Sequence, residues 1–128
     1  GKITYMKGYN QAVVRLVTAV SDFIVLPSYF EPCGLEDFIA QAYGTIPVAH
    51  KTGGLNKIKD GITGFLYEEN ESVSLVAKLS EVITIKKLMP SCIETIVKQG
   101  ALSVHNEYYW KNVIQEKYLP FFKEIIKK

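Results

Sequence analysis

Cysteine is scarce in this chain of 128 residues, with Cys33 and Cys92 as the only two, and neither belongs to a CxxC pair. This scarcity excludes a disulfide framework and a cysteine-rich zinc site, and it favours a reducing, cytoplasmic location. The two histidines, His50 and His105, are far apart and have no cysteine or carboxylate at ligand spacing. The sequence therefore predicts no metal site and no cofactor.

Long apolar runs and a strong charge of one sign are also missing. No apolar stretch approaches the ~20 residues of a membrane-spanning helix, and nothing at the amino end is typical of a secretion signal. The net charge is only +2 and the lysines are scattered, which is too weak to indicate a nucleic-acid-binding surface. We therefore expect neither a membrane nor a nucleic acid as a partner.

The chain has the size and composition of one globular domain over residues 1–128, with 48% hydrophobic and 22% charged residues. Its apolar pattern alternates between strand and helix. We expect strands at 3–6, 23–26, 46–49 and 65–67, and helices at 11–20, 35–43, from 72 onward, 90–104 and 108–128. This order predicts an α/β fold, a Rossmann-like parallel sheet flanked by helices, and it resembles the later part of a doubly wound domain.

Several single residues mark where these helices begin and end. Asn10 is expected to cap the amino end of the first helix, and Gly44 the carboxyl end of the second. Gly100 is expected to interrupt the helix at 90–104, and Pro120 to kink or break the last helix.

The loop over residues 27–35 is the strongest candidate for a site. It follows an apolar run at 23–26, which we expect to be a strand buried on both faces, and it leads into a helix. Open α/β sheets bind ligands at such loops, and the amino end of a helix suits a phosphate. Glu31 in this loop would meet a phosphorylated ligand, where its carboxylate could stabilise an oxocarbenium-like transition state or bind sugar hydroxyls. The alternative is a loop glutamate that caps a helix or faces water.

Other residues near this loop also have two interpretations. Gly34 and the pair Gly53-Gly54 could bring backbone close to a ligand or serve only as turns. Cys33 could be a nucleophile or a packed thiol, and the ring of Tyr9, after Gly8, could stack on a base or pack against the protein.

The acidic pair Glu36 and Asp37 could join Glu31 as catalytic carboxylates, as in glycoside hydrolysis. Their place in a first helical turn instead favours a role in complementing the helix dipole.

Characteristic runs occur in order along nearly the whole chain: Gly8-Tyr9, Ala19-Val20-Ser21-Asp22, Pro27-Ser28, Phe30-Glu31-Pro32-Cys33-Gly34-Leu35, Tyr43-Gly44-Thr45, Pro47-Val48, Thr52-Gly53-Gly54-Leu55, Thr63-Gly64-Phe65 and Trp110. Taken together they resemble the bacterial glycogen synthase and plant starch synthase family of glycosyltransferases. The Glu-Pro-Cys-Gly-Leu run is specific to this family, since related glycosyltransferases usually have Phe where Cys33 stands.

This resemblance implies the second half of the carboxyl-terminal domain of a two-domain GT-B enzyme. Such enzymes transfer glucose from ADP-glucose, or UDP-glucose in some members, to the non-reducing end of an α-1,4-glucan, with retention of configuration and without a metal. Cytoplasm, or plastid in a plant, is the location that the resemblance implies. It assigns Glu31 as the catalytic-site carboxylate, Cys33, Gly34, Leu35, Thr52, Gly53 and Gly54 as substrate-binding, and Gly8 and Tyr9 as nucleotide-binding.

Departures from the family pattern limit these expectations. The family usually follows Leu35 with Thr-Gln-Leu-Tyr, whereas Glu36 and Asp37 follow it here and would repel a diphosphate unless they point away. The family's diphosphate-binding Arg and Lys and its amino-terminal, acceptor-binding portion lie outside this chain. We therefore expect the chain alone to be inactive, to bind ADP weakly or not at all, and to self-associate through an exposed strand edge. Two other functions stay open: a GT-B enzyme for another acceptor, such as a lipid or cell wall, and a degenerate sugar- or nucleotide-binding domain.

Overall fold

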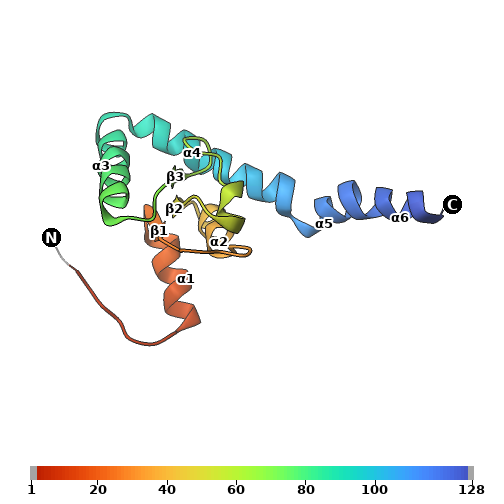
Figure 1. Cartoon of the computed structure of the whole chain (residues 1–128), viewed down its shortest axis with the longest axis horizontal. Helices are drawn as coiled ribbons and strands as arrows, with labels where there is room; N and C mark the ends of the chain where they lie inside the picture. The colour runs from red at the N-terminus through yellow and green to blue at the C-terminus, as the bar shows by residue number, and fades with distance from the viewer. Residues whose placement is uncertain (1–2, 127–128) are drawn as a thin grey trace.

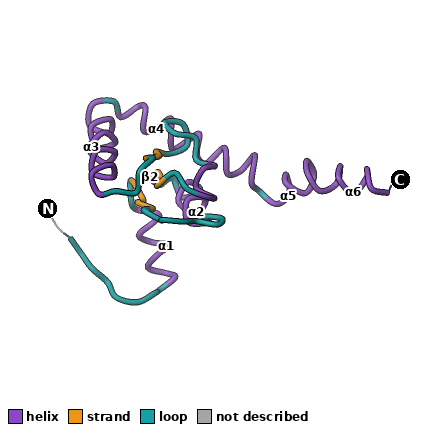
Figure 2. The backbone as a smooth tube through the Cα atoms, viewed as in Figure 1, coloured by secondary structure: helices purple, strands orange, loops and turns teal. Residues whose placement is uncertain are grey.

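The computed structural model describes residues 3–126, which contain a parallel three-stranded sheet with helices packed around it (Figures 1 and 2). The strands β1 (Phe23–Leu26), β2 (Ile46–His50) and β3 (Phe65–Tyr67) lie in that order. The helices are α1 (Gln11–Val20), α2 (Glu36–Tyr43), α3 (Ser72–Leu88), α4 (Pro90–Ser103), α5 (Trp110–Val113) and α6 (Leu119–Ile126). A 3-10 helix, η1 (Gly53–Lys57), and two π-helical segments, η2 (Val104–Tyr108) and η3 (Ile114–Tyr118), complete the order. The expected α/β class with a parallel sheet is confirmed.

The strands β2 and β3 are the buried strands of this sheet. In register, Val25 of β1 pairs with Val48 of β2, and Val48 pairs with Phe65 of β3. The expectation that residues 23–26 are buried on both faces is wrong, because β1 lies at the edge of the sheet and Val25 is 39% exposed. β3 lies at the opposite edge and is nevertheless buried at all three positions, because α3 packs against it.

The core divides into two apolar clusters because side chains alternate between the two faces of the sheet. One cluster joins Val48 and Phe65 to Val82 of α3 and Ile96 of α4. The other packs Leu55 and Ile58, which follow β2, against Ala49 of β2 and Leu66 of β3. Each fully buried aliphatic side chain contributes about 1.5–3 kcal/mol of transfer free energy, so these clusters hold the loops that follow β1 and β2 on a fixed base.

Helix ends follow the expected capping residues. The side chain of Asn10 accepts hydrogen bonds from the backbone N–H groups of Ala12 and Val13 at the start of α1. Gly44 ends α2 in the left-handed conformation, with φ of 85°. The expected interruption at Gly100 is wrong, since α4 continues through it. A Cβ at this position would lie 3.3 Å from the side chain of Gln41, so Gly100 lets α4 pack closely on α2.

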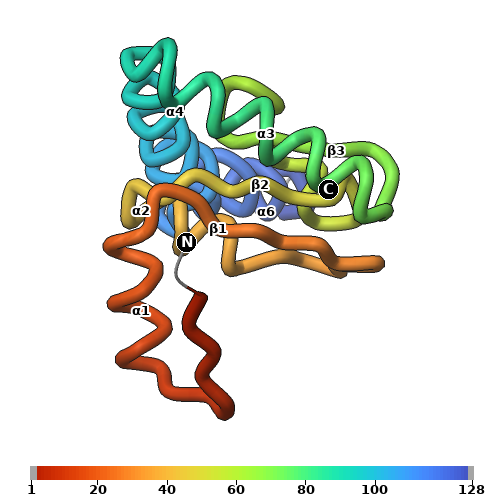
Figure 3. Tube along the Cα trace, turned by 90° about the vertical axis from the view of Figure 1, so that its left-hand side faces the viewer, coloured from red at the N-terminus to blue at the C-terminus, as the bar shows by residue number. Residues whose placement is uncertain are grey.

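Residues 3–6 are not a strand. Ile3 and Tyr5 are 99% and 85% exposed, and the segment runs away from the sheet (Figure 3). A strand forms only where its backbone groups find a neighbouring strand, and this segment has none among the described residues.

The last part of the chain extends away from the sheet as a helical projection (Figure 1). Pro120 does not break it, because α6 begins at Leu119 and continues through the proline. The π-helical segment η3 directly precedes α6, in which Pro120 is the second residue, and such a wide turn can absorb the missing N–H and the bulk of the ring. Residues 127 and 128 of the expected helix lie outside the described part. Of the helices that the structure describes, none has the length and apolar character to cross a membrane.

Candidate functional site

Two loops leave the sheet at the carboxyl ends of its strands, and they lie close together because β1 and β2 are parallel neighbouring strands. Residues 27–35 follow β1 and lead into α2, while residues 51–57 follow β2 and end in η1. The structure thus brings together Glu31 and the pair Gly53-Gly54, which the sequence singled out separately.

The backbones of these two loops are in direct contact. The N–H of Gly54 donates to the carbonyl oxygen of Glu31 at 2.6 Å, and the hydroxyl of Thr52 donates to the carbonyl oxygen of Tyr29 at 3.3 Å. A Cβ at Gly53 would lie 2.1 Å from the Glu31 carbonyl oxygen, and one at Gly54 would lie 2.1 Å from that of Cys33. Only glycine permits this approach, so the glycine pair serves to join the two loops.

The Glu31 carboxylate is held within its own loop. Its Oε1 atom accepts a hydrogen bond from the N–H of Gly34 at 3.0 Å. Gly34 has φ of 68°, a left-handed conformation that glycine adopts without strain, and its Cβ position faces Leu55 and Lys57 at 3.1 Å. The turn therefore sets the direction of a partly buried carboxylate at the carboxyl edge of the sheet.

The neighbouring acids Glu36 and Asp37 point in different directions. Glu36 is exposed, whereas the Asp37 side chain is fully buried and its Oδ1 atom lies 3.1 Å from Nζ of Lys57. Burial raises the pKa of Asp37, although the ammonium of Lys57 opposes this shift. Of the two carboxylates expected to repel a diphosphate at the start of α2, only that of Glu36 stays exposed, because Asp37 is turned inward and paired with Lys57.

Sequence reasoning missed two residues of this edge, Lys57 and His50. The Nδ1 atom of His50 lies 2.7 Å from the Ser28 carbonyl oxygen, and its Nε2 atom lies 3.2 Å from that of Glu68. This ring therefore connects the end of β2 to the segments that follow β1 and β3. A signal for Lys57 was present, because Asp37 shares the inward face of α2 with Ala40 and Gln41, and a buried carboxylate requires a partner.

The predicted nucleotide-binding residues lie apart from these loops. Gly8 and Tyr9 precede α1, whose amino end points away from the sheet (Figures 1 and 3), and Tyr9 is 81% exposed. Leu35, directly before α2, is 59% exposed. The assignments of these residues stay predictions.

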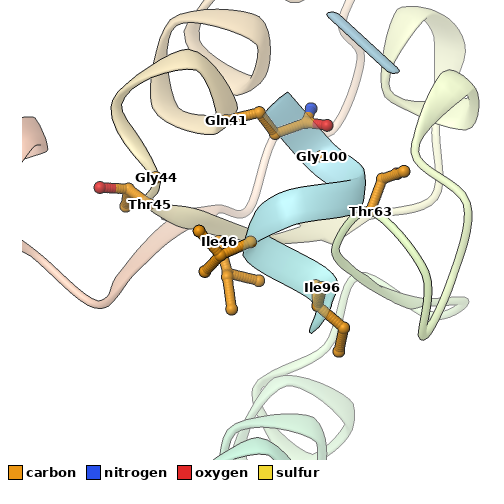
Figure 4. Close-up of a pocket in the computed structure, with 8 residues that line it drawn as sticks. Gln41, Gly44, Thr45, Ile46, Thr63, Ile96 and Gly100 are labelled. Carbon is orange, nitrogen blue, oxygen red and sulfur yellow. The ribbon is translucent and has the colours of Figure 1, made fainter. Parts of the chain in front are cut away.

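Three hollows of the described surface lie away from Glu31. Figure 4 shows one between α2, β2 and α4, with Gln41, Ile46, Ile96 and Gly100 in its lining, and it has no room for a water molecule. Two open hollows of about 270 and 240 Å³ lie at Cys92 on α4 and at Phe121 on α6. Within residues 3–126, no three His, Cys, Asp or Glu side chains come together as a metal-binding group would require.

Comparison with known proteins identifies the family. The sequence model of the glycosyl transferases group 1 family matches residues 2–99, which include both loops. The chain belongs to this glycosyltransferase family.

Two curated relatives and one solved structure show where this glycosyltransferase chain fits in its family. It is 33% identical over 126 residues to the glycogen synthase of Thermodesulfovibrio yellowstonii, covering 98% of this chain and 24% of the relative. It is 45% identical over 85 residues to the glycogen synthase of Pseudomonas fluorescens, covering 66% of this chain and 16% of the relative. The catalytic domain of Arabidopsis thaliana starch synthase IV, solved with ADP and acarbose, superposes with a TM-score of 0.74 at 26% identity, over 94% of this chain and 26% of that one. The glycosyltransferase chain therefore spans about a quarter of the length of the relatives that it matches in full.

Proposed function

We propose that this chain is the part of a glycogen or starch synthase that presents Glu31 to the glucose of a nucleotide-sugar donor. The observation that carries the proposal is the hydrogen bond from the Gly34 N–H to Oε1 of Glu31, in a loop that the glycine pair fixes from the neighbouring strand. The similarity to glycogen synthases and to a starch synthase supports glucose as the transferred sugar and an α-glucan as the acceptor. The ADP in that starch synthase structure favours ADP-glucose as the donor.

The chemistry of this transfer explains why a carboxylate is useful. The bond between the anomeric carbon and the diphosphate oxygen breaks, and its electron pair leaves with the nucleoside diphosphate. A hydroxyl oxygen of the acceptor bonds to the same carbon, with retention of configuration, and its proton passes to the leaving diphosphate. Positive charge develops on the sugar in between, and a preorganised carboxylate such as that of Glu31 would stabilise it. The proposal includes no metal and no cofactor.

The direction of α2 also suits this donor. The amino end of a helix carries unpaired N–H groups and partial positive charge, which favour a phosphate. Asp37 does not oppose this, because it is buried against Lys57. We place the diphosphate near this end and the sugar beside Glu31.

A chimera tests the proposal, in which this chain replaces the matching segment of the Thermodesulfovibrio glycogen synthase. We expect the chimera to incorporate labelled glucose from ADP-glucose into glycogen, and the chain alone to show no transfer. Glu31→Gln should lower kcat by about 100-fold or more, since it removes a charge that stabilises the transition state. The matched control is Glu94→Gln, which changes an exposed carboxylate on α4 and should alter kcat little.

Three other outcomes separate the alternatives. Full activity of the Glu31→Gln chimera would show that Glu31 is not catalytic, and would favour a domain that only binds sugar or nucleotide. A folded chimera that transfers glucose to a lipid or cell-wall acceptor, and not to glycogen, would favour a GT-B enzyme of another class. Transfer from UDP-glucose in preference to ADP-glucose would change only the donor in the proposal and would leave the role of Glu31 as proposed.

A further inference from the structure

The ammonium of Lys57 occupies a nearly closed position between the two loops. Its Nζ atom donates to the carbonyl oxygens of Cys33 at 2.6 Å and Gly34 at 2.5 Å, and it lies 3.1 Å from Oδ1 of Asp37. It also sits 4.1 Å from the ring centre of Phe38. Two of the three hydrogens of the ammonium are donated to these carbonyl oxygens. Oδ1 of Asp37 is attracted by charge alone, since no hydrogen bond from the described residues reaches this buried atom.

These contacts bear on Glu31 through a single peptide group. The carbonyl of Cys33, which accepts from Lys57, belongs to the same planar unit as the N–H of Gly34, which donates to Oε1 of Glu31. Fixing the oxygen of this unit fixes the direction of its N–H. A cation at the oxygen also polarises the unit, which strengthens the hydrogen bond that the N–H makes.

We propose that Lys57 is a positioning residue, which holds the Cys33–Gly34 peptide group so that its N–H orients the Glu31 carboxylate, with Asp37 fixing the ammonium from behind. The catalytic consequence rests on the proposed function, whereas the linkage itself belongs to this chain. Asp37 has no exposed surface, and the Lys57 side chain is 15% exposed. Two buried charges at this distance gain little net stability, because desolvation offsets their attraction. The placement of the ion pair against the Cys33–Gly34 peptide group is consistent with a role in fixing geometry.

The test in this chain compares Lys57→Met with Lys59→Met. Lys59 lies two positions further along, and its ammonium pairs with Glu107 at 2.7 Å in an exposed ion pair instead of with the Cys33 and Gly34 carbonyls. Amide hydrogen exchange by NMR reports both the loop and the core. We expect Lys57→Met to speed amide exchange at Gly34 by about 10-fold or more relative to the core amide of Val48. This is the change expected when the charge-assisted hydrogen bond from the Gly34 N–H to Glu31 is lost. Lys59→Met should leave that ratio unchanged, and Lys57→Arg should restore most of it.

An equal acceleration at Gly34 and Val48 in Lys57→Met would show a general loss of stability and would overturn the proposal. So would identical behaviour of the Lys57→Met and Lys59→Met variants. Should Lys57→Met fail to fold, the unaltered chain still decides, because a fixed ammonium exchanges its protons slowly with water. Slow exchange at Nζ of Lys57, with fast exchange at Nζ of Lys59, supports the proposal, and equally fast exchange at both overturns it.

In the chimera, Lys57→Met should lower kcat with little change in the KM for ADP-glucose, since the affected carboxylate acts in the transition state. A raised KM with unchanged kcat would overturn the catalytic consequence. An inactive chimera in which the exchange results hold would instead refute only the proposed function, so the two failures are distinguishable.

Discussion

Asp37 and its neighbour Glu36 show how burial alone separates two acids that are adjacent in sequence. The sequence predicted that both complement the dipole of α2, and Glu36 is exposed in its first turn as that role requires. Asp37 is instead enclosed, and burial raises its pKa above the ordinary value even beside Lys57. A buried carboxylate with a raised pKa costs free energy when it ionises.

This shift predicts a specific dependence of stability on pH. Because the folded state holds the Asp37 proton more tightly than the unfolded state, the carboxyl contributes most stability below its unfolded pKa. That contribution is lost as the pH rises through the raised pKa of the folded state. We therefore expect the stability of the chain relative to Asp37→Asn to fall over this window and then level off, measured by urea unfolding at a series of pH values. Glu36→Gln is the control, and a relative stability of the Asp37 chain that rises with pH would contradict the prediction.

The residues of the candidate site differ in how far sequence could predict them. Glu31 was predictable because a loop after an apolar strand is local information, and its motif is specific. The reason for Gly53 and Gly54 was not, since their close approach is to the Glu31–Cys33 backbone of another loop. Lys57 was missed for the same cause, as its oxygen partners belong to a segment that precedes β2.

At the scale of elements, local signals predicted those helices and strands whose capping residues and contacts lie close in sequence. Asn10 and Gly44 fixed the ends of α1 and α2 through hydrogen bonds and a left-handed residue close in sequence. Residues 3–6 failed as a strand because strand formation depends on a partner that sequence periodicity does not reveal. Gly100 and Pro120 failed as helix breakers because packing on Gln41 and the η3 turn compensate for them.

The helices α3 and α4 pack on one face of the sheet. Substitutions on the inner and outer sides of α4 should therefore differ in their effect on stability. Ile96 packs against Ile46 and Val48 and is 6% exposed, whereas Leu102 of the same helix is 51% exposed. We expect Ile96→Ala to lower the free energy of unfolding by about 2–4 kcal/mol, through lost burial and a cavity. Leu102→Ala should cost less than about 1 kcal/mol. Equal losses by urea unfolding would show that α4 does not pack on the sheet as described.

At the scale of the whole molecule, the chain divides into a sheet-centred body and the projecting helices. The body contains both core clusters and both loops of the candidate site. The carboxyl-terminal arm, which we define as residues 110–126, runs away from it (Figures 1 and 2). The sequence predicted the arm as a helix and could not predict its direction, because its contacts with the body are few and no local signal sets the angle.

The exposed apolar side chains of the arm predict that the chain associates in solution. Trp110, Phe121 and Phe122 are 68%, 57% and 51% exposed, and apolar surface of this kind favours association. The sequence pointed instead to a strand edge, but β1 has only four residues, and short edge strands pair poorly. We expect the full chain to form concentration-dependent oligomers in size-exclusion chromatography with light scattering.

A variant ending at Tyr109 separates the two routes of association. It retains the contact between the rings of Phe38 and Tyr108, whose centres are 4.5 Å apart, so the body should stay folded. We expect this variant to elute as a monomer and to melt within a few degrees of the full chain, since the removed residues lie outside both core clusters. Oligomers that persist without the arm would place association at the sheet edge. A large fall in melting temperature would show that the arm stabilises the body, and it would contradict this prediction.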